Sequence, residues 1–192
     1  MNYQDYIWDL GGTLLDNYGT STAAFVHTLQ DFGLTASHDE VYKALKVSTE
    51  YAVRQFAPRN KEFLKAYKAN EAKELEHPIL FDGASELLAQ IIQQGGRNFL
   101  ISHRDDQVLE ILQKTQISAY FTEVVTATNG FKRKPDPESM LYLKDKYQIE
   151  SGLVIGDRPI DIEAGQAAGF SCYLFDNMKN LEEFVDIELE KE

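Results

Sequence analysis

The sequence predicts an α/β domain built on a parallel sheet, with an all-helical segment inserted after its first strand. Two observations support this prediction. Short apolar runs alternate with stretches whose apolar residues recur at helical spacing, and residues 17–79 interrupt that alternation with helical patterns only. Strands that are separated by helices pair in parallel through right-handed crossovers, and this arrangement gives a layered α/β domain.

The strands are expected at short apolar runs, and the helices of the same domain at the periodic stretches between them. The strands lie at residues 4–9, 98–101, 123–126, 152–155 and 171–175, and the helices at 84–94, 105–115, 137–147 and 159–168. Gly95 and Gly96 stop the first of these helices, and Gly169 is expected to cap the last. Asp136 is expected to cap the third helix, with Pro137 in its first turn, where proline is tolerated.

The inserted segment reads as four consecutive helices. They are expected at about residues 20–32, 38–46, 48–57 and 60–76. Ser37 and Glu40 have the spacing of a capping box at the start of the second helix. We therefore expect residues 1–16 and 80–192 to form the sheet domain and residues 17–79 a small all-α domain. A long helical crossover within a single domain is the alternative.

Composition excludes several classes of protein. The chain has 192 residues, and 19 basic against 31 acidic residues give a formal net charge of −12. Such an acidic surface disfavours nucleic-acid binding and repels anionic membranes. The single cysteine, Cys172, excludes an intramolecular disulfide framework, and no apolar run reaches the ~20 residues that span a bilayer. The N-terminal residues lack the pattern of a signal peptide, so a cytoplasmic protein is expected.

Polar side chains follow four of the expected strands. Asp9 follows the first strand, Ser102 the second, Lys134 comes after the third, and Asp157 follows the fourth. Ligands of open parallel sheets bind at the carboxyl ends of the strands, near the switch in strand order. Each residue alone would be an ordinary helix cap or a solvated side chain. Together they predict a shared site.

These residue types suit phosphoryl chemistry. Two carboxylates from different strands, Asp9 and Asp157, can share one Mg²⁺, which prefers oxygen ligands. Lys134 and the Ser102 hydroxyl can hold phosphoryl oxygens, and loop amides beyond the first strand can add donors. A carboxylate that faces phosphorus can attack it, and water then hydrolyses the aspartyl-phosphate. The sequence therefore predicts a hydrolase of a small phosphorylated substrate.

The chain resembles the haloacid dehalogenase-like hydrolase superfamily over nearly its whole length. Four motifs carry the resemblance: Asp9-Leu10-Gly11-Gly12-Thr13, Ser102, Lys134 before Pro135, and Gly156-Asp157 followed by Asp161. The resemblance implies a three-layer Rossmann-like core in which Asp9 is the nucleophile and residues 17–79 form a cap that selects substrate. It also implies a Mg²⁺ site at Asp9, the Gly11 carbonyl and Asp157, with Asp161 orienting that site or Lys134.

One position departs from the family pattern. Related phosphatases carry a second aspartate, the general acid and base, two residues after the nucleophile, and here that residue is Gly11. The loss of such a group typically costs 10²–10⁴-fold in rate. Its carbonyl can still bind metal, because any residue supplies one. His103, directly after Ser102, is a candidate to approach the site.

The resulting expectation is a Mg²⁺-dependent phosphatase similar to phosphoglycolate phosphatases. Asp9, Ser102 and Lys134 are the expected catalytic residues, and Gly11, Gly12 and His103 join Ser102 and Lys134 around the substrate. The alternatives are cleavage of a phosphonate, dehalogenation of a haloacid, and a catalytically weak phosphate-binding protein, which Gly11 favours. Both a monomer and a homodimer are compatible with the sequence.

Overall fold

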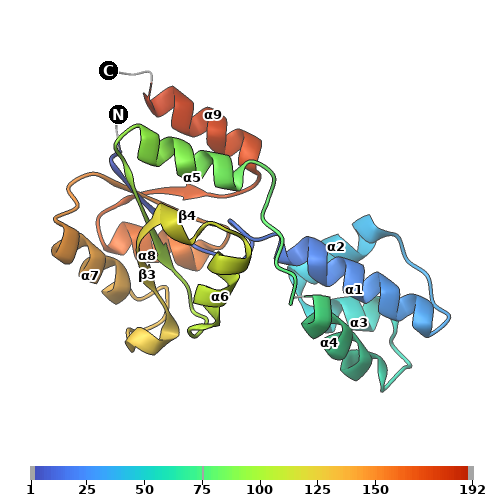
Figure 1. Ribbon diagram of the computed structural model, residues 1–192. Coiled ribbons are helices and arrows are strands. Elements are labelled where there is room, and N and C mark those ends of the chain that lie inside the picture. Colours follow the sequence, from blue (N-terminus) through green and yellow to red (C-terminus); the bar gives the residue numbers. More distant parts are fainter. Residues whose placement is uncertain (1–2, 75, 190–192) are drawn as a thin grey trace. The chain divides into compact units, whose positions relative to one another are not determined.

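The larger part of the chain is built on a parallel sheet with β1 (Asp5–Trp8) at its centre (Figure 1). The computed structural model describes residues 3–74 and 76–189. Within these residues five strands pair in the order β3-β2-β1-β4-β5, all in parallel. The other strands are β2 (Arg97–Ile101), β3 (Phe121–Val125), β4 (Gly152–Gly156) and β5 (Ser171–Leu174). Strand order switches between β1 and β4, so the carboxyl end of β1 is the expected ligand position.

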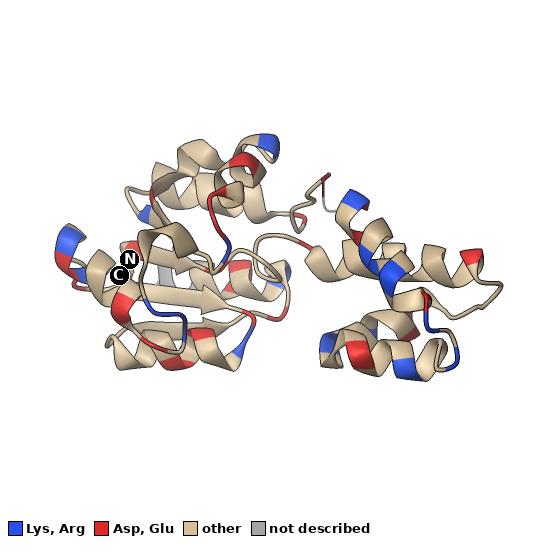
Figure 2. Ribbon diagram, turned by 90° about the horizontal axis from the view of Figure 1, so that it is seen from below, with Lys and Arg blue, Asp and Glu red and all other residues tan. Residues whose placement is uncertain are grey.

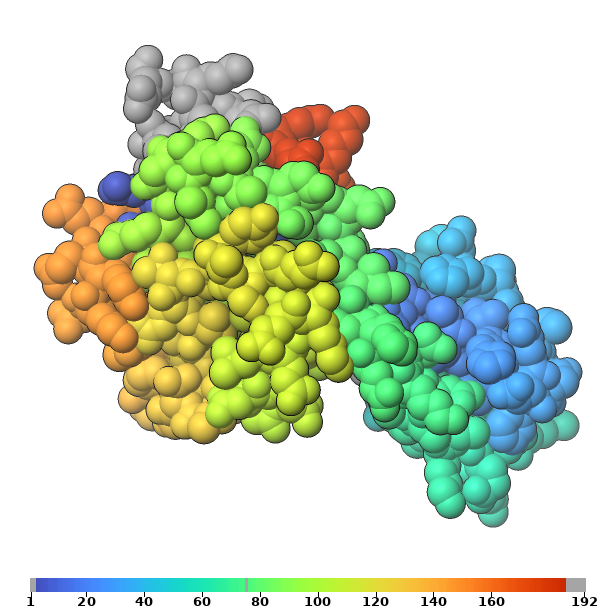
Figure 3. Space-filling view, viewed as in Figure 1, coloured from blue at the N-terminus to red at the C-terminus, as the bar shows by residue number. Residues whose placement is uncertain are grey.

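Helices cover both faces of this sheet and complete a three-layer domain (Figure 1). Tyr6 and Trp8 of β1 pack into one buried cluster together with α5 (Ala84–Gln93), α6 (Gln107–Lys114) and α9 (Met178–Leu189). Ile7 points to the opposite face and packs with α7 (Glu138–Tyr147) and α8 (Pro159–Ala167). Two short 3₁₀ turns, η1 (Ser118–Tyr120) and η2 (Ala127–Asn129), flank β3. Figure 3 shows the same side of the molecule in space-filling form, coloured along the sequence.

The chain divides into two compact units, one of Met1–Leu15 with Leu80–Glu192 and one of Asp16–Ile79. The second unit contains α1 (Asn17–Asp31), α2 (His38–Val47), α3 (Thr49–Phe56) and α4 (Phe63–Glu74), and its described residues form no strand. Phe25 of α1 is fully buried and meets the rings of Phe63 and Tyr67 of α4, with centroids 4.9 Å away in each case. This unit therefore has a core of its own.

The fold class predicted from the sequence is confirmed, and so is the Ser37–Glu40 capping box. Two helix ends lie one residue away from their predicted places. α7 begins after Pro137 rather than after Asp136, although the Asp136 carboxylate still accepts the Glu138 N–H at 3.0 Å. The C-cap of α8 is Ala168, and Gly169 follows it with a φ of 79°. Helix α9 is absent from the sequence-based prediction.

Charged residues of both signs are interspersed over both units (Figure 2). The chain as a whole carries a formal net charge of −12. In the described part of the chain, every helix is too short or too polar to cross a membrane.

Candidate active site

The candidate site forms where the central strands end. Asp9 follows β1, Ser102 follows β2 and Asp157 follows β4, and β1 is paired with both of the other strands. Asp9 and Ser102 are both buried. The hydrogen bond from Asp9 N–H to the Ile155 carbonyl, at 2.9 Å, extends the ladder by one step past β1. The sheet therefore fixes these residues at a common edge.

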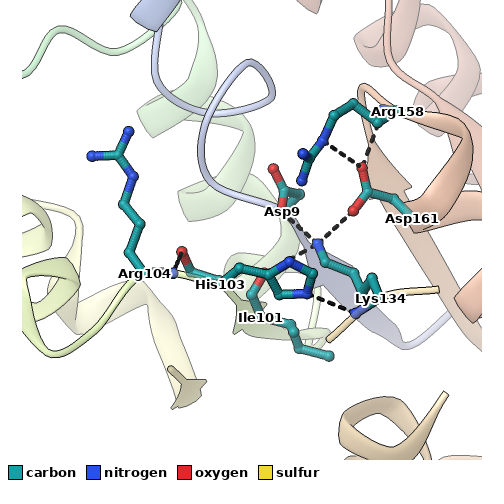
Figure 4. A network of polar contacts seen from close by, with 8 residues as sticks. Asp9, Ile101, His103, Arg104, Lys134, Arg158 and Asp161 are labelled. Carbon is teal, nitrogen blue, oxygen red and sulfur yellow. Dashed lines mark hydrogen bonds and ion pairs between the residues drawn. The ribbon is translucent and has the colours of Figure 1, made fainter. Parts of the chain in front are cut away.

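Lys134 connects the strand ends through its ammonium group (Figure 4). Its Nζ lies 2.5 Å from Asp9 Oδ1 and 2.5 Å from Asp161 Oδ1, and donates to the Ile101 carbonyl at 3.4 Å. The Lys134 side chain is only 1% exposed. A buried cation is costly unless it is paired. The carboxylates of Asp9 and Asp161 therefore stabilise the charge of Lys134, and Lys134 stabilises theirs. Burial raises the pKa of Asp9, and the Lys134 charge opposes that rise.

Three carboxylates form an acidic cluster beside Lys134. Asp9, Asp157 and Asp161 each offer an oxygen, and these oxygens lie within 4.8 Å of one another. Burial raises the pKa of Asp157 to about 6, and the charges of Asp9 and Asp161 act in the same direction. Asp157 Oδ1 is buried, and the described residues give it no hydrogen-bond partner. An orphaned carboxylate oxygen in such a cluster fits a hard divalent cation with oxygen ligands.

Asp161 differs from Asp157 in its partners. Its Oδ1 pairs with Lys134, and its Oδ2 accepts the main-chain N–H of Arg158 at 3.1 Å (Figure 4). Both oxygens of Asp161 are thus engaged by the protein itself. The geometry supports the expected orienting role of Asp161 and leaves Asp157 as the better candidate metal ligand.

The loop after Asp9 brings backbone close to the acidic cluster. Gly12 has a φ of 86°, and a Cβ at this position would collide with the carboxylate of Asp157. Glycine is therefore required at position 12, both for its left-handed backbone and for space. The Gly12 N–H donates to the Leu15 carbonyl at 2.9 Å, so the amide donor expected of Gly12 is already used within the loop. Gly11 forms a bridge pair with Leu15.

Ser102 and His103 occupy the end of β2. Ser102 Oγ accepts the Arg104 N–H at 3.2 Å, and no hydrogen bond joins it to the Lys134 network among the described residues. His103 Nε2 accepts the main-chain N–H of Lys134 at 2.8 Å. Burial lowers the pKa of His103 to about 4, and the positive charge of Lys134 adds to the effect. His103 is consequently neutral near pH 7.

The family of the chain follows from a comparison with known proteins. The model of the haloacid dehalogenase-like hydrolase family matches residues 6–175. The chain belongs to this family. The match includes every strand of the described sheet except Asp5, the first residue of β1, and it includes every candidate residue of the site. The four motifs that suggested the family from the sequence therefore lie within the matched region.

Relatives of this haloacid dehalogenase-like hydrolase are known from sequence and structure. A hydrolase from Streptococcus pneumoniae TIGR4 is 69% identical, with a TM-score of 0.94 over 97% of this chain and 100% of the other. A phosphoglycolate phosphatase of Aliivibrio fischeri is 29% identical, covering 88% of this chain and 81% of its own. The pyrophosphatase PpaX of Oceanobacillus iheyensis is 26% identical, with the same two coverages.

The structure of this haloacid dehalogenase-like hydrolase brings most of the predicted site residues together. Asp9, Lys134 and Asp161 share one ion-pair network, and Asp157 joins it through the acidic cluster. The main-chain carbonyl of Ile101 and the main-chain N–H of Arg158 are absent from the sequence-based candidates. Every residue type supplies these main-chain groups, so the amino-acid sequence does not single them out. Their only signal in the sequence is a position close to the end of a predicted strand.

Proposed function

We propose that this hydrolase removes the phosphoryl group from a small phosphorylated metabolite with the help of Mg²⁺. The main support is the position of Asp9, a buried carboxylate at the centre of the sheet that Lys134 and the acidic cluster surround. The relatives named phosphoglycolate phosphatase and pyrophosphatase favour the same chemistry. The substrate class is a phosphate monoester or a phosphoanhydride.

The proposed reaction begins with attack by Asp9 on phosphorus. Since Asp9 Oδ1 pairs with Lys134, we assign Oδ2 as the attacking oxygen of this carboxylate. A bond from Oδ2 to phosphorus forms while the bond from phosphorus to the leaving oxygen breaks. Water then attacks the aspartyl-phosphate, which releases inorganic phosphate and restores the carboxylate.

The remaining residues of the site would neutralise the charge of the phosphoryl group and keep it oriented toward Asp9. Lys134 and the Ser102 hydroxyl would bind the phosphoryl oxygens, which carry negative charge throughout the reaction. Asp9, Asp157 and the Gly11 carbonyl would hold Mg²⁺, and Asp161 would keep Lys134 in place. The cation, when bound, supplies neutralisation of phosphoryl charge.

Because position 11 is glycine, we expect the reaction rate to depend strongly on the leaving group of the substrate. Without a general acid at this position, the leaving oxygen departs with little help from a proton. Substrates whose leaving group is already a stable anion, such as phosphoanhydrides, depend least on that help. We therefore expect the rate to rise steeply as the leaving group becomes more acidic.

The decisive experiment is a screen of phosphorylated metabolites with Mg²⁺, in which Asp9→Asn is the matched control. The screen includes 2-phosphoglycolate, pyrophosphate and sugar phosphates, with excess chelator in a parallel series. Turnover that disappears in Asp9→Asn and in chelator is the expected result. Circular dichroism of the Asp9→Asn variant checks that its fold is retained.

A second candidate function is phosphate binding without turnover, and Gly11 is the observation that favours it. Saturable Mg²⁺-dependent binding of inorganic phosphate, with no turnover in the whole panel, would support this function and contradict a phosphatase. Chelator-resistant release of halide from a haloacid would instead indicate dehalogenation. Release of phosphate from a phosphonate would indicate cleavage of a C–P bond.

A further inference from the structure

Lys134 depends on a loop for its position. It lies between η2 and α7, in a segment whose neighbouring residues Arg133 and Pro135 are exposed. Its ammonium group pairs with Asp9 and Asp161, but its backbone lies in a loop and takes no part in the hydrogen bonds of the sheet. The catalytic placement of Lys134 therefore requires something that anchors its main chain.

Hydrogen bonds join the segment after β2 to the end of β3 and the loop that follows it. Two are between main-chain groups, Ser102 N–H to the Val125 carbonyl at 2.9 Å and Ala127 N–H to the Arg104 carbonyl at 2.8 Å. A third is between side chains, from Thr126 Oγ1 to Asp106 Oδ1 at 2.8 Å. Another runs from Lys134 N–H to the imidazole of His103, and this is the one that holds the main chain of the catalytic residue itself (Figure 4).

The same contact fixes the protonation state of the ring. Because Nε2 accepts a hydrogen bond, it carries no proton, and the single proton of the neutral imidazole resides on Nδ1. A ring held in this way uses its Nε2 lone pair for the Lys134 backbone. That nitrogen is then unavailable to accept a proton from water or to donate one to a leaving group.

We propose that His103 is a positioning residue, whose imidazole holds the main chain of Lys134 so that its ammonium group meets Asp9 and the phosphoryl group. This inference rests on the proposed function of Lys134. In this role His103 does not substitute for the acid and base group that is missing at Gly11. A displacement of about 1 Å at such a group typically costs up to about 100-fold in rate.

The chain offers a matched set of variants. His103→Gln keeps an acceptor at roughly the reach of Nε2, whereas His103→Leu removes it. A cavity of about 250 Å³ borders His103, Thr126 and Ser139, so both side chains have space to fit. His27→Leu is the control, because His27 lies on α1 in the other unit with its side chain 63% exposed.

The first test requires no turnover. Long-range proton–nitrogen spectra of the labelled protein should show one histidine with Nδ1 protonated and Nε2 bare, and this signal should vanish in His103→Gln. Inorganic phosphate with Mg²⁺ should bind about tenfold more weakly to His103→Leu than to the parent, and nearly normally to His103→Gln. A proton on Nε2 of His103, or equal phosphate affinity in all variants, would overturn the proposal.

The second test uses a substrate found in the screen. We expect kcat to fall about 10- to 100-fold in His103→Leu, to recover to within a few-fold in His103→Gln, and to stay unchanged in His27→Leu. The pH profile of His103→Gln should match that of the parent. Loss of one limb of that profile would identify His103 as an acid or base, and equal damage by Gln and Leu would also overturn the positioning role. If the parent turns over nothing, the proposed function fails, while the spectra and phosphate affinities still decide on His103.

Discussion

Asp157 and Asp161 are four residues apart, yet their oxygens have different partners. Asp157 Oδ1 has no hydrogen-bond partner among the described residues, whereas both oxygens of Asp161 are engaged by Lys134 and Arg158. We predict that Asp157→Asn weakens Mg²⁺ binding by about tenfold or more, and that Asp161→Asn weakens it less, because of these two residues only Asp157 would contact the cation directly. Calorimetric titration of Mg²⁺ into both variants measures the difference. Unchanged affinity in Asp157→Asn would remove this residue from the site.

Gly11 is the second residue at which a prediction can be made. We predict that Gly11→Asp raises phosphatase turnover by about tenfold or more, because acid and base groups contribute 10²–10⁴-fold. The left-handed conformation of the loop falls at Gly12, which must remain glycine. Folding and Mg²⁺ affinity of the variant are measured first, and initial rates follow. A folded, metal-binding variant no faster than the parent would mean that proton transfer does not limit this site.

His103 also makes stability depend on pH. Its pKa is about 4 in the folded protein against 6.5 for an ordinary histidine, so between these values the unfolded chain binds a proton that the folded protein does not. The stability that the neutral His103 ring gives the folded protein is therefore fully present above pH 6.5 and is lost as pH falls toward 4. Urea unfolding at pH 7 and pH 5 should show a larger loss of stability in the parent than in His103→Gln. Parallel losses in the two proteins would contradict the lowered pKa.

At the scale of elements, close packing of α8 on the sheet depends on one glycine. A Cβ on Gly165 would lie 2.6 Å from Cys172 Sγ of β5 and 3.0 Å from Val154 Cβ of β4. Alanine favours a helix interior over glycine by up to about 1 kcal/mol, but overpacking costs about 1–3 kcal/mol. We predict that Gly165→Ala lowers the free energy of unfolding by about 1–2 kcal/mol. Urea denaturation measures it.

Gln166→Ala is the matched control for that substitution, because Gln166 is exposed on the same helix. A change within about 0.5 kcal/mol is expected there, since exposed positions contribute little. A Gly165→Ala protein at least as stable as the parent would show that α8 can shift away from β4 and β5 at no cost.

At the scale of the whole molecule, two connecting segments join the units. They run beside each other, with Asp16 N–H donating to the Ile79 carbonyl at 2.9 Å and Phe81 N–H donating to the Leu14 carbonyl at 3.0 Å. We propose that residues 17–79 act as a substrate-selecting cap, whose closure would exclude water from the reaction. Hydrogen exchange in residues 15–19 and 77–82 should then slow when Mg²⁺ and a phosphate analogue bind. A bound analogue with unchanged exchange in both segments would contradict a mobile cap.

Much of the fold was predictable, because local patterns determine strands and helices. Apolar runs located all five strands of the described sheet to within two residues, and the Ser37–Glu40 spacing located a helix start. The start of α7 and the end of α8 were displaced by one residue, because neighbouring positions can satisfy the same N–H groups at a helix start or the same carbonyl groups at a helix end.

The sequence by itself determined the α/β class, the family and the residue types of the site. Asp9, Ser102, Lys134 and Asp157 all follow strands, and chain order alone predicts that strand ends converge. Only the tertiary structure decided which partners these residues have. Lys134 meets Asp9 across 125 positions and His103 across 31. Such contacts depend on strand order and loop conformation, and these are set by packing of the whole sheet rather than by any local pattern.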